Sequence, residues 1–263
     1  AAEARGDPPC AIWVAEQLSD AGLSPPVLES APRRASTVVR IPGADPAAPA
    51  LLVHGHLDVV PAEPADWQSF PFSGEVRDGA VWGRGALDMK DMDAMMLAFV
   101  QHLGRTGQRP PRDVVMAFVA DEEDTGDFGA GFLCREHPDL FEGVTAAISE
   151  SGGHSVHLSD GARLYPIAAG ERGSAWMTVT VRGTAGHGSR RNDDNAITKA
   201  AALVMRFAEY QWPVRAVPIV RALLDGLSDH LGKEITPEDL SALGAAAPLP
   251  AGSPGAVACP SPK

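Results

Sequence analysis

The sequence is poor in cysteine and in basic residues. Its 263 residues include three widely separated cysteines without C-x-x-C spacing, and 22 basic against 34 acidic residues, a formal net charge of -12. The cysteines indicate neither a disulfide framework nor a cysteine-zinc site, and they fit a reducing, cytoplasmic setting. The acidic balance argues against nucleic acid or an anionic membrane as a partner, because both select for basic patches. We therefore expect small molecules or peptides as partners.

Long apolar runs are also missing. No stretch of about 18 apolar residues occurs, and the first residues, AAEARGDPPC, lack the apolar core of a secretion signal, so we expect no membrane span and no leader here. An initiator methionine is absent as well, so we expect the natural N-terminus to lie upstream. With 44% hydrophobic residues, the chain can still bury a substantial core in one large domain or two smaller ones.

Helical and strand-like apolar patterns alternate along residues 8–150. Apolar residues at helical spacing predict helices at 8–22, 87–104 and 129–138, the second closed by Gly104. Short apolar runs predict strands at 36–41, 50–56, 113–123 and 144–150. The run at 113–123 is too continuous for a half-exposed sheet, so both of its faces should be covered. This alternation predicts the α/β class with a three-layer sheet.

The character of the sequence changes near Gly173. Residues 174–183, SAWMTVTVRG, alternate as a strand with one exposed face, and helices are predicted from Asn195 to Tyr210 and from Pro218 to His230. We therefore expect a first domain at 1–172 and a smaller unit at 173–243. The tail at 244–263 is rich in Ala, Pro, Gly and Ser with few bulky apolar residues, so we expect it to be disordered.

Polar side chains that can bind metal stand where the predicted strands end. They are His56, Asp58, Asp88, Glu122, Glu123 and Glu150. Because the carboxyl ends of parallel strands meet at one edge of a sheet, these groups should converge there, and so much negative charge needs cations. Histidine and carboxylate ligands without cysteine suit Zn²⁺, or Co²⁺ or Mn²⁺ in its place, and a shared carboxylate suits two ions.

Five ordered motifs carry a resemblance to a known family. They are HGHLDVVPA, WGRGALDMKDMDAM, ADEE, ISESGG and GTAGHGS. In this order and at these separations they resemble the co-catalytic zinc hydrolases that include succinyl-diaminopimelate desuccinylase, acetylornithine deacetylase, aminoacylase and glutamate carboxypeptidase. The resemblance covers about residues 8–230. It implies a zinc-aminopeptidase-like catalytic domain, followed by the start of an inserted α+β lid or dimerisation domain.

The resemblance also implies which residues hold the metal. His56 and Glu150 would bind one zinc ion, Asp88 would bridge both ions, and Glu123 would bind the other. A cis peptide bond between Asp88 and Met89 is implied in the same way. The expected cofactor is therefore a pair of zinc ions, for which cobalt or manganese can substitute.

Three further residues receive roles from the resemblance. Glu122 would be the general base, which takes a proton from a metal-held water and passes it to the leaving nitrogen. Asp58 would orient the His56 ring. His187, in GTAGHGS, would reach across a homodimer to the partner's site and hydrogen-bond the substrate carbonyl oxygen. The implied activity is hydrolysis of the amide bond of an N-acyl amino acid or short peptide.

Other interpretations compete at several positions. His54 is expected to be a packed, hydrogen-bonded histidine outside the site, and Asp88 could also cap the helix that follows it. A serine hydrolase using Ser151 or Ser189 lacks the G-x-S-x-G motif. Four further acidic residues are assigned to solvent: Asp91, Asp93, Asp121 and Asp124.

The sequence departs from the pattern of this family at its C-terminal end. Members return from the lid to the first domain and supply one more metal-binding histidine, whereas no histidine follows His230 here. We therefore expect a fragment or a frame change, with Asp88 and Glu123 left on the second ion. Two hypotheses stand: a metal-dependent amidohydrolase, and an inactive remnant that at most binds metal or a partner.

Overall fold

The computed structural model describes residues 8–150, 155–157, 161, 163–170, 173, 175 and 177–239. They fall into two compact units, one ending at Ile167 and the other beginning at Ala168. The predicted domain boundary at residues 172 and 173 stays a prediction. The tail predicted at 244–263 lies outside the described residues. Among the described helices, none is long and apolar enough to cross a membrane.

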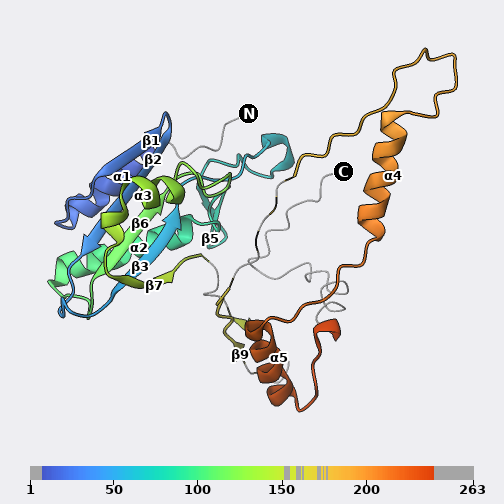
Figure 1. The fold of residues 1–263 in the computed structure, drawn as a ribbon. Coiled ribbons are helices and arrows are strands. Elements are labelled where there is room, and N and C mark those ends of the chain that lie inside the picture. Colours follow the sequence, from blue (N-terminus) through green and yellow to red (C-terminus); the bar gives the residue numbers. More distant parts are fainter. Residues whose placement is uncertain are drawn as a thin grey trace. The chain divides into compact units, whose positions relative to one another are not determined.

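A five-stranded sheet forms the centre of the first unit (Figure 1). In sheet order its strands are β1 (Val27–Ala31), β2 (Arg34–Ile41), β6 (Val114–Val119), β3 (Ala50–His56) and β7 (Val144–Ile148). β3 pairs in parallel with β6 and β7, whereas β2 is antiparallel to β1 and β6. The register sets His56 opposite Val119, so β3 and β6 end at the same edge. The four predicted strands are thus confirmed, and β1 was missed.

Helices cover both faces of this sheet. On one face, α1 (Pro8–Asp20) and α2 (Lys90–Thr106) pack their apolar sides against β2 and β6. On the other, α3 (Ala130–Glu136) and the 3-10 helix η2 (Pro138–Phe141) pack against the same strands. β6 is buried along its whole length, as its continuous apolar run predicts. The three-layer α/β prediction is therefore confirmed.

The predicted end of α2 at Gly104 is wrong. The helix continues to Thr106 and ends at Gly107, whose φ of 65° provides a left-handed C-cap. Gly104 has a packing role instead, because a Cβ there would lie 2.8 Å from the carbonyl oxygen of Ala21. A glycine inside a helix can thus mark a close approach of two helices rather than a helix end.

Short elements complete the first unit. Between β3 and α2 lie η1 (Pro64–Asp66) and an antiparallel hairpin of β4 (Glu75–Arg77) and β5 (Ala80–Trp82). After β7 comes a second small hairpin of β8 (Val156–His157) and β9 (Arg163–Leu164). None of these elements was predicted from the sequence.

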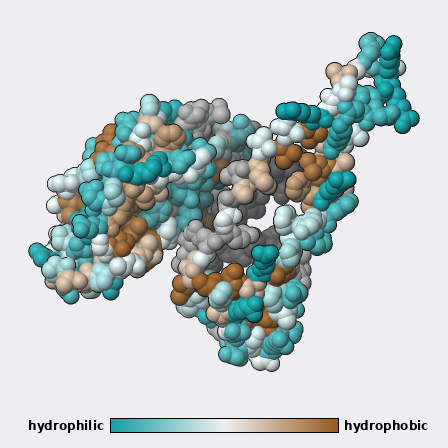
Figure 2. Space-filling view, viewed as in Figure 1, coloured by the Kyte–Doolittle hydropathy of each residue, from teal (hydrophilic) through white to brown (hydrophobic). Residues whose placement is uncertain are grey.

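The described part of the second unit consists mainly of two helices, α4 (Ala196–Glu209) and α5 (Pro218–Leu231), both as predicted. Asn195 caps α4 by accepting hydrogen bonds from the backbone N–H groups of Ile197 and Thr198. Apolar side chains lie at the surface over these helices (Figure 2), and α4 has no buried residue.

The strand predicted at 174–183 is wrong for the residues described there, 175 and 177–183, which form no ladder. An alternating pattern gives a strand only where a neighbour supplies hydrogen bonds. The side chains of Met177 and Val179 remain 74% and 56% exposed. The described residues therefore show the helices, but not the sheet, of the expected α+β lid.

Candidate metal centre

His56, the last residue of β3, is surrounded by carboxylates. Its Nε2 atom lies 3.1 Å from Asp88 Oδ1, 3.2 Å from Glu150 Oε2 and 3.7 Å from Glu122 Oε2. Two overlapping groups bring their candidate ligand atoms within 4.8 Å of one another: His56 with Glu122 and Glu150, and His56 with Asp88 and Glu123. The structure thus brings the four predicted ligands and the predicted base together at one edge of the sheet.

Asp58 connects His56 to the backbone of Glu122 and Glu123. Its carbonyl oxygen lies 3.0 Å from His56 Nδ1, and its carboxylate Oδ1 lies 3.6 Å from the same atom. The two carboxylate oxygens also accept hydrogen bonds from the backbone N–H groups of Glu122 and Glu123, at 3.1 Å each. Asp58 therefore fixes the His56 ring and the Glu122–Glu123 backbone together. The sequence indicated only the first of these contacts.

The loop that carries Asp88 is packed tightly against the loop after β3. Gly85 adopts a φ of +81°, and a Cβ there would lie 2.4 Å from Val59 Cγ1. Lys90 Nζ donates a hydrogen bond to the carbonyl oxygen of Leu57 at 2.5 Å. The Asp88–Met89 peptide bond is cis, as the family resemblance implied. α2 begins only at Lys90 with Met89 as its N-cap, so the capping interpretation of Asp88 is wrong.

The electrostatics of the cluster favour a cation. Burial opposes a charge on His56, but the hydrogen bond and charge of Asp58, with the charge of Glu122, outweigh it and raise the pKa of His56 to about 10. Burial and neighbouring carboxylates raise the pKa of Glu122 and of Glu123 above the usual range, against the opposing effect of His56. Without metal, a proton on His56 thus supplies the positive charge that these carboxylates require.

The donor set fits one or two divalent cations. One imidazole and several carboxylate oxygens suit zinc, cobalt or manganese, and the two groups share His56. The Nε2 atom faces the carboxylates while Nδ1 is held by Asp58, the arrangement that orients a histidine ligand. The roles assigned to the individual ligands stay predictions.

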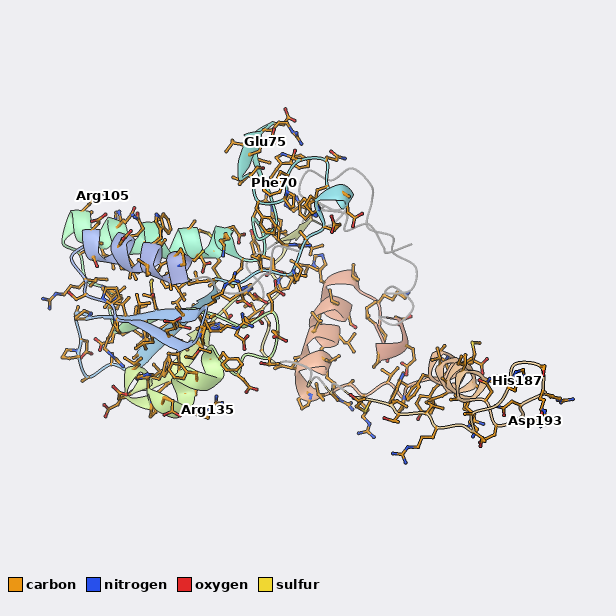
Figure 3. All side chains as sticks on the ribbon, turned by 90° about the horizontal axis from the view of Figure 1, so that it is seen from above. Phe70, Glu75, Arg105, Arg135, His187 and Asp193 are labelled. Atoms are coloured by element: carbon orange, nitrogen blue, oxygen red, sulfur yellow. The ribbon has the colours of Figure 1, made fainter. Side chains whose placement is uncertain are left out.

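Neither His54 nor His187 belongs to the two ligand groups. His54 Nδ1 is 2.9 Å from Ser149 Oγ, in agreement with the expected packed, hydrogen-bonded histidine. His187 lies in the second unit, in the exposed loop that precedes α4 (Figure 3), with Nδ1 2.8 Å from Ser189 Oγ. Its predicted role across a dimer stays a prediction.

The assignment of Asp121 to solvent is wrong. Asp121 is 1% exposed and pairs with Arg34, whose Nε lies 2.9 Å from Asp121 Oδ1. Its Oδ2 accepts hydrogen bonds from Thr125 Oγ1 and from the Phe128 backbone N–H at 3.1 Å each. Asp121 therefore anchors the turn that presents Glu122, whereas the side chain of Asp124 is 69% exposed, as expected. Arg34 lies far away in sequence, so no local signal indicated this pair.

The assignment of Asp93 to solvent is also wrong, whereas Asp91 is exposed as expected. Asp93 is 4% exposed, and neither carboxylate oxygen has a hydrogen-bond partner among the described residues. It faces Gly55, where a Cβ would lie 2.5 Å from Asp93 Oδ1. The helical period could have shown this, because Asp93 continues the buried stripe of Met96, Leu97 and Val100. Burial raises the pKa of Asp93 to about 7, against the opposing charges of Lys90 and His56.

A buried carboxyl with a raised pKa makes folding stability depend on pH. The folded state holds the Asp93 proton up to about pH 7, whereas the unfolded chain releases it near the ordinary value of 3.8. Stability therefore falls as pH rises from about 4 to 7, and the loss is complete above that. We expect Asp93→Asn to stabilise the metal-free protein by up to about 4 kcal/mol at pH 8 and hardly at pH 4.

Urea unfolding at several pH values measures this difference. Asp20→Asn, an exposed change at the end of α1, is the matched control and should leave the pH profile unchanged. A gain from Asp93→Asn that is equal at pH 4 and pH 8 would show that the carboxyl does not titrate as its burial requires.

Comparison with known proteins places this α/β chain in a peptidase family. A sequence profile described as Peptidase family M20/M25/M40 matches residues 52–248, and the chain belongs to this family. It is 33% identical to aminoacylase-1 of Sus scrofa over 71% of this chain and 45% of the relative, and 32% identical to aminoacylase-1B of Rattus norvegicus over 75% and 48%. The N-fatty-acyl-amino acid synthase/hydrolase PM20D1 of Xenopus tropicalis is 31% identical over 68% and 35%. The chain spans about half the length of the aminoacylases it matches.

Solved structures of the same kind are also similar. Human carnosine dipeptidase 1 matches with a TM-score of 0.47 and 23% identity over 52% of this chain and 31% of that chain. The dipeptidase Dug1p of Saccharomyces cerevisiae matches with a TM-score of 0.45 and 27% identity over 53% and 32%.

Proposed function

We propose that the protein is a zinc-dependent hydrolase that cleaves the amide bond of an N-acyl amino acid or a short peptide. The observation that carries the proposal is the position of His56 among four carboxylates, in two overlapping ligand groups at the carboxyl ends of parallel strands. The names of the aminoacylase relatives support this substrate class. The imidazole and carboxylate donors support zinc.

In this proposal, His56 and Glu150 would hold one ion, Glu123 would hold the other, and Asp88 would be shared between them. Metal held there would supply an acidified water as the nucleophile for amide hydrolysis. Asp58 contacts both His56 and the Glu122–Glu123 backbone. These contacts fix the ligands at the two strand ends relative to each other.

Glu122 acts as the general base. Its Oε2 atom lies near His56 Nε2, and its pKa is raised above the usual range by burial and by Glu150, Glu123 and Asp58. A carboxylate whose pKa lies closer to neutrality accepts a proton from water more readily than an ordinary carboxylate, and its acid form can still donate that proton to the more basic leaving nitrogen. Glu122 can therefore serve both proton transfers of amide cleavage.

Turnover tests the proposed function directly. The purified protein, loaded with Zn²⁺ or Co²⁺, is assayed on a panel of N-acyl amino acids and dipeptides, with metal content measured on the same sample. The proposal expects hydrolysis that a chelator abolishes and added metal restores. Metal content without turnover would favour the alternative, a chain that binds metal or a partner without catalysis. A sample with neither metal nor turnover would refute the proposal and would leave only partner binding from the alternative.

We further propose a homodimer in which His187 serves the partner's site, and a cytoplasmic setting, which the free thiols of Cys10 and Cys134 support. If His187 stabilises the developing oxyanion, His187→Ala should lower kcat by about 10² or more. Because each subunit would then supply what the other lacks, mixing His187→Ala with Asp88→Ala subunits should restore part of the activity. Activity is measured after the mixed subunits exchange. An active dimer without any recovery on mixing would place His187 in its own subunit's site or in none.

A further inference from the structure

Two exposed apolar side chains stand directly beside the candidate ligands. Val60 is 39% exposed, and its backbone N–H donates a hydrogen bond to Glu123 Oε1 at 3.3 Å. Leu87 is 63% exposed and immediately precedes Asp88, whose carboxylate lies 3.1 Å from His56 Nε2. Leu87 therefore lies on the segment that carries Asp88, and Val60 lies on the segment after His56 and is hydrogen-bonded to Glu123.

The two segments form one surface. Gly85 approaches the side chain of Val59, and Lys90 Nζ donates to the carbonyl oxygen of Leu57, so the loop at 57–60 is fixed against the loop at 85–90. Lys90 supplies the only formal cation of these two loops, and this hydrogen bond already engages its ammonium. Apart from the metal itself, these two loops offer an anionic substrate group no free cation with which to pair. An uncharged, apolar group suits this surface instead.

We propose that Val60 and Leu87 form an apolar subsite that selects the acyl group of the substrate, so that acyl chains longer than acetyl are preferred. The inference rests on the proposed amide hydrolysis and adds to it the part of the substrate that these residues contact. Val60 and Leu87 determine specificity and take no part in the proton transfers.

The reacting atoms explain why the acyl group, rather than the amino-acid side chain, occupies this surface. In amide hydrolysis the attacked carbon is the acyl carbonyl carbon, so it comes closest to the ligand cluster. The next carbon of the acyl chain is bonded directly to it, whereas the amino-acid side chain is separated from it by the nitrogen and Cα. The apolar side chains adjoining Asp88 and Glu123 are therefore nearer to the acyl chain. The amino-acid carboxylate turns away from these acidic residues.

The test compares N-octanoyl-methionine with N-acetyl-methionine in the metal-loaded protein. Leu87→Ser and Val60→Thr should each lower the octanoyl-to-acetyl ratio of kcat/KM, by about tenfold for the double variant, because a less apolar subsite discriminates less between acyl chains of different length. Val60→Thr preserves the backbone hydrogen bond to Glu123, so any effect of this substitution comes from the changed side chain. Val76→Thr is the control, because Val76 is 76% exposed on β4, next to Glu75 (Figure 3).

Two results would overturn the inference. One is an unchanged acyl ratio in the double variant. The other is a changed preference for the amino-acid side chain with a constant acyl ratio, which would assign the surface to the other half of the substrate. If neither substrate is hydrolysed, the proposed function fails first, and calorimetry of N-octanoyl-methionine on the metal-loaded protein decides the subsite: weaker binding to the double variant supports it, and absent or equal binding refutes it.

Discussion

Glu122→Gln is expected to keep the metal of the protein and to lose about 10² to 10⁴ in hydrolysis rate. The amide cannot take a proton from water, so both proton transfers lose their carrier. The side chain should remain in place, because the contact that positions it runs from the Glu122 backbone N–H to Asp58 and survives the substitution. The loss should therefore fall on kcat, with little change in KM.

Steady-state kinetics and metal analysis on one preparation measure this effect. Glu16→Gln, which removes an exposed carboxylate on α1, makes the same chemical change away from the cluster and should leave both readouts unchanged. Near-full activity of Glu122→Gln would refute the assigned base. Loss of an ion would show instead that Glu122 acts as a ligand. Its position close to His56 and Glu150 would allow that role.

The position of the cluster could be predicted from the sequence because it follows from strand ends. The apolar runs that precede His56, Glu122 and Glu150 fix where β3, β6 and β7 stop, and a parallel sheet then brings those ends to one edge. Asp88 follows no such run, and the resemblance of its motif to the family supplied its place. The apolar strand pattern and the family motif around Asp88 together thus predicted the cluster.

The errors arose where a side chain's environment depends on distant residues or on a helical face. Asp121 is buried because Arg34, from another strand, pairs with it, and local composition carries no record of that contact. Asp93 was assigned to solvent as part of the exposed start of the helix, although it lies on the buried stripe of α2. The segment 177–183 has the alternation of a strand but no ladder in the described structure, since pairing requires a second strand.

Asp88→Ala should remove metal and activity together, the largest effect of a single substitution at this site. Asp88 Oδ1 lies 3.1 Å from His56 Nε2, and in the proposed scheme this residue alone contacts both ions. Without Asp88, each ion keeps fewer protein ligands, and no other group replaces the lost negative charge. The Asp88 side chain is 59% exposed, so the fold should survive, with a stability change of about 0.5 kcal/mol or less in the metal-free state.

Metal content, turnover and thermal unfolding with and without added Zn²⁺ measure this loss. Wild-type protein should unfold at a higher temperature with zinc, because an ion that binds only the folded state stabilises it, and Asp88→Ala should lose most of that shift. Asp91→Ala is the matched control, since it removes the same charge from the exposed first turn of α2 and should retain the zinc shift, the metal and the rate. An Asp88→Ala protein that still held two ions and hydrolysed substrate at the wild-type rate would mean that the ions are bound without it, and the bridging role would have to pass to another carboxylate around His56.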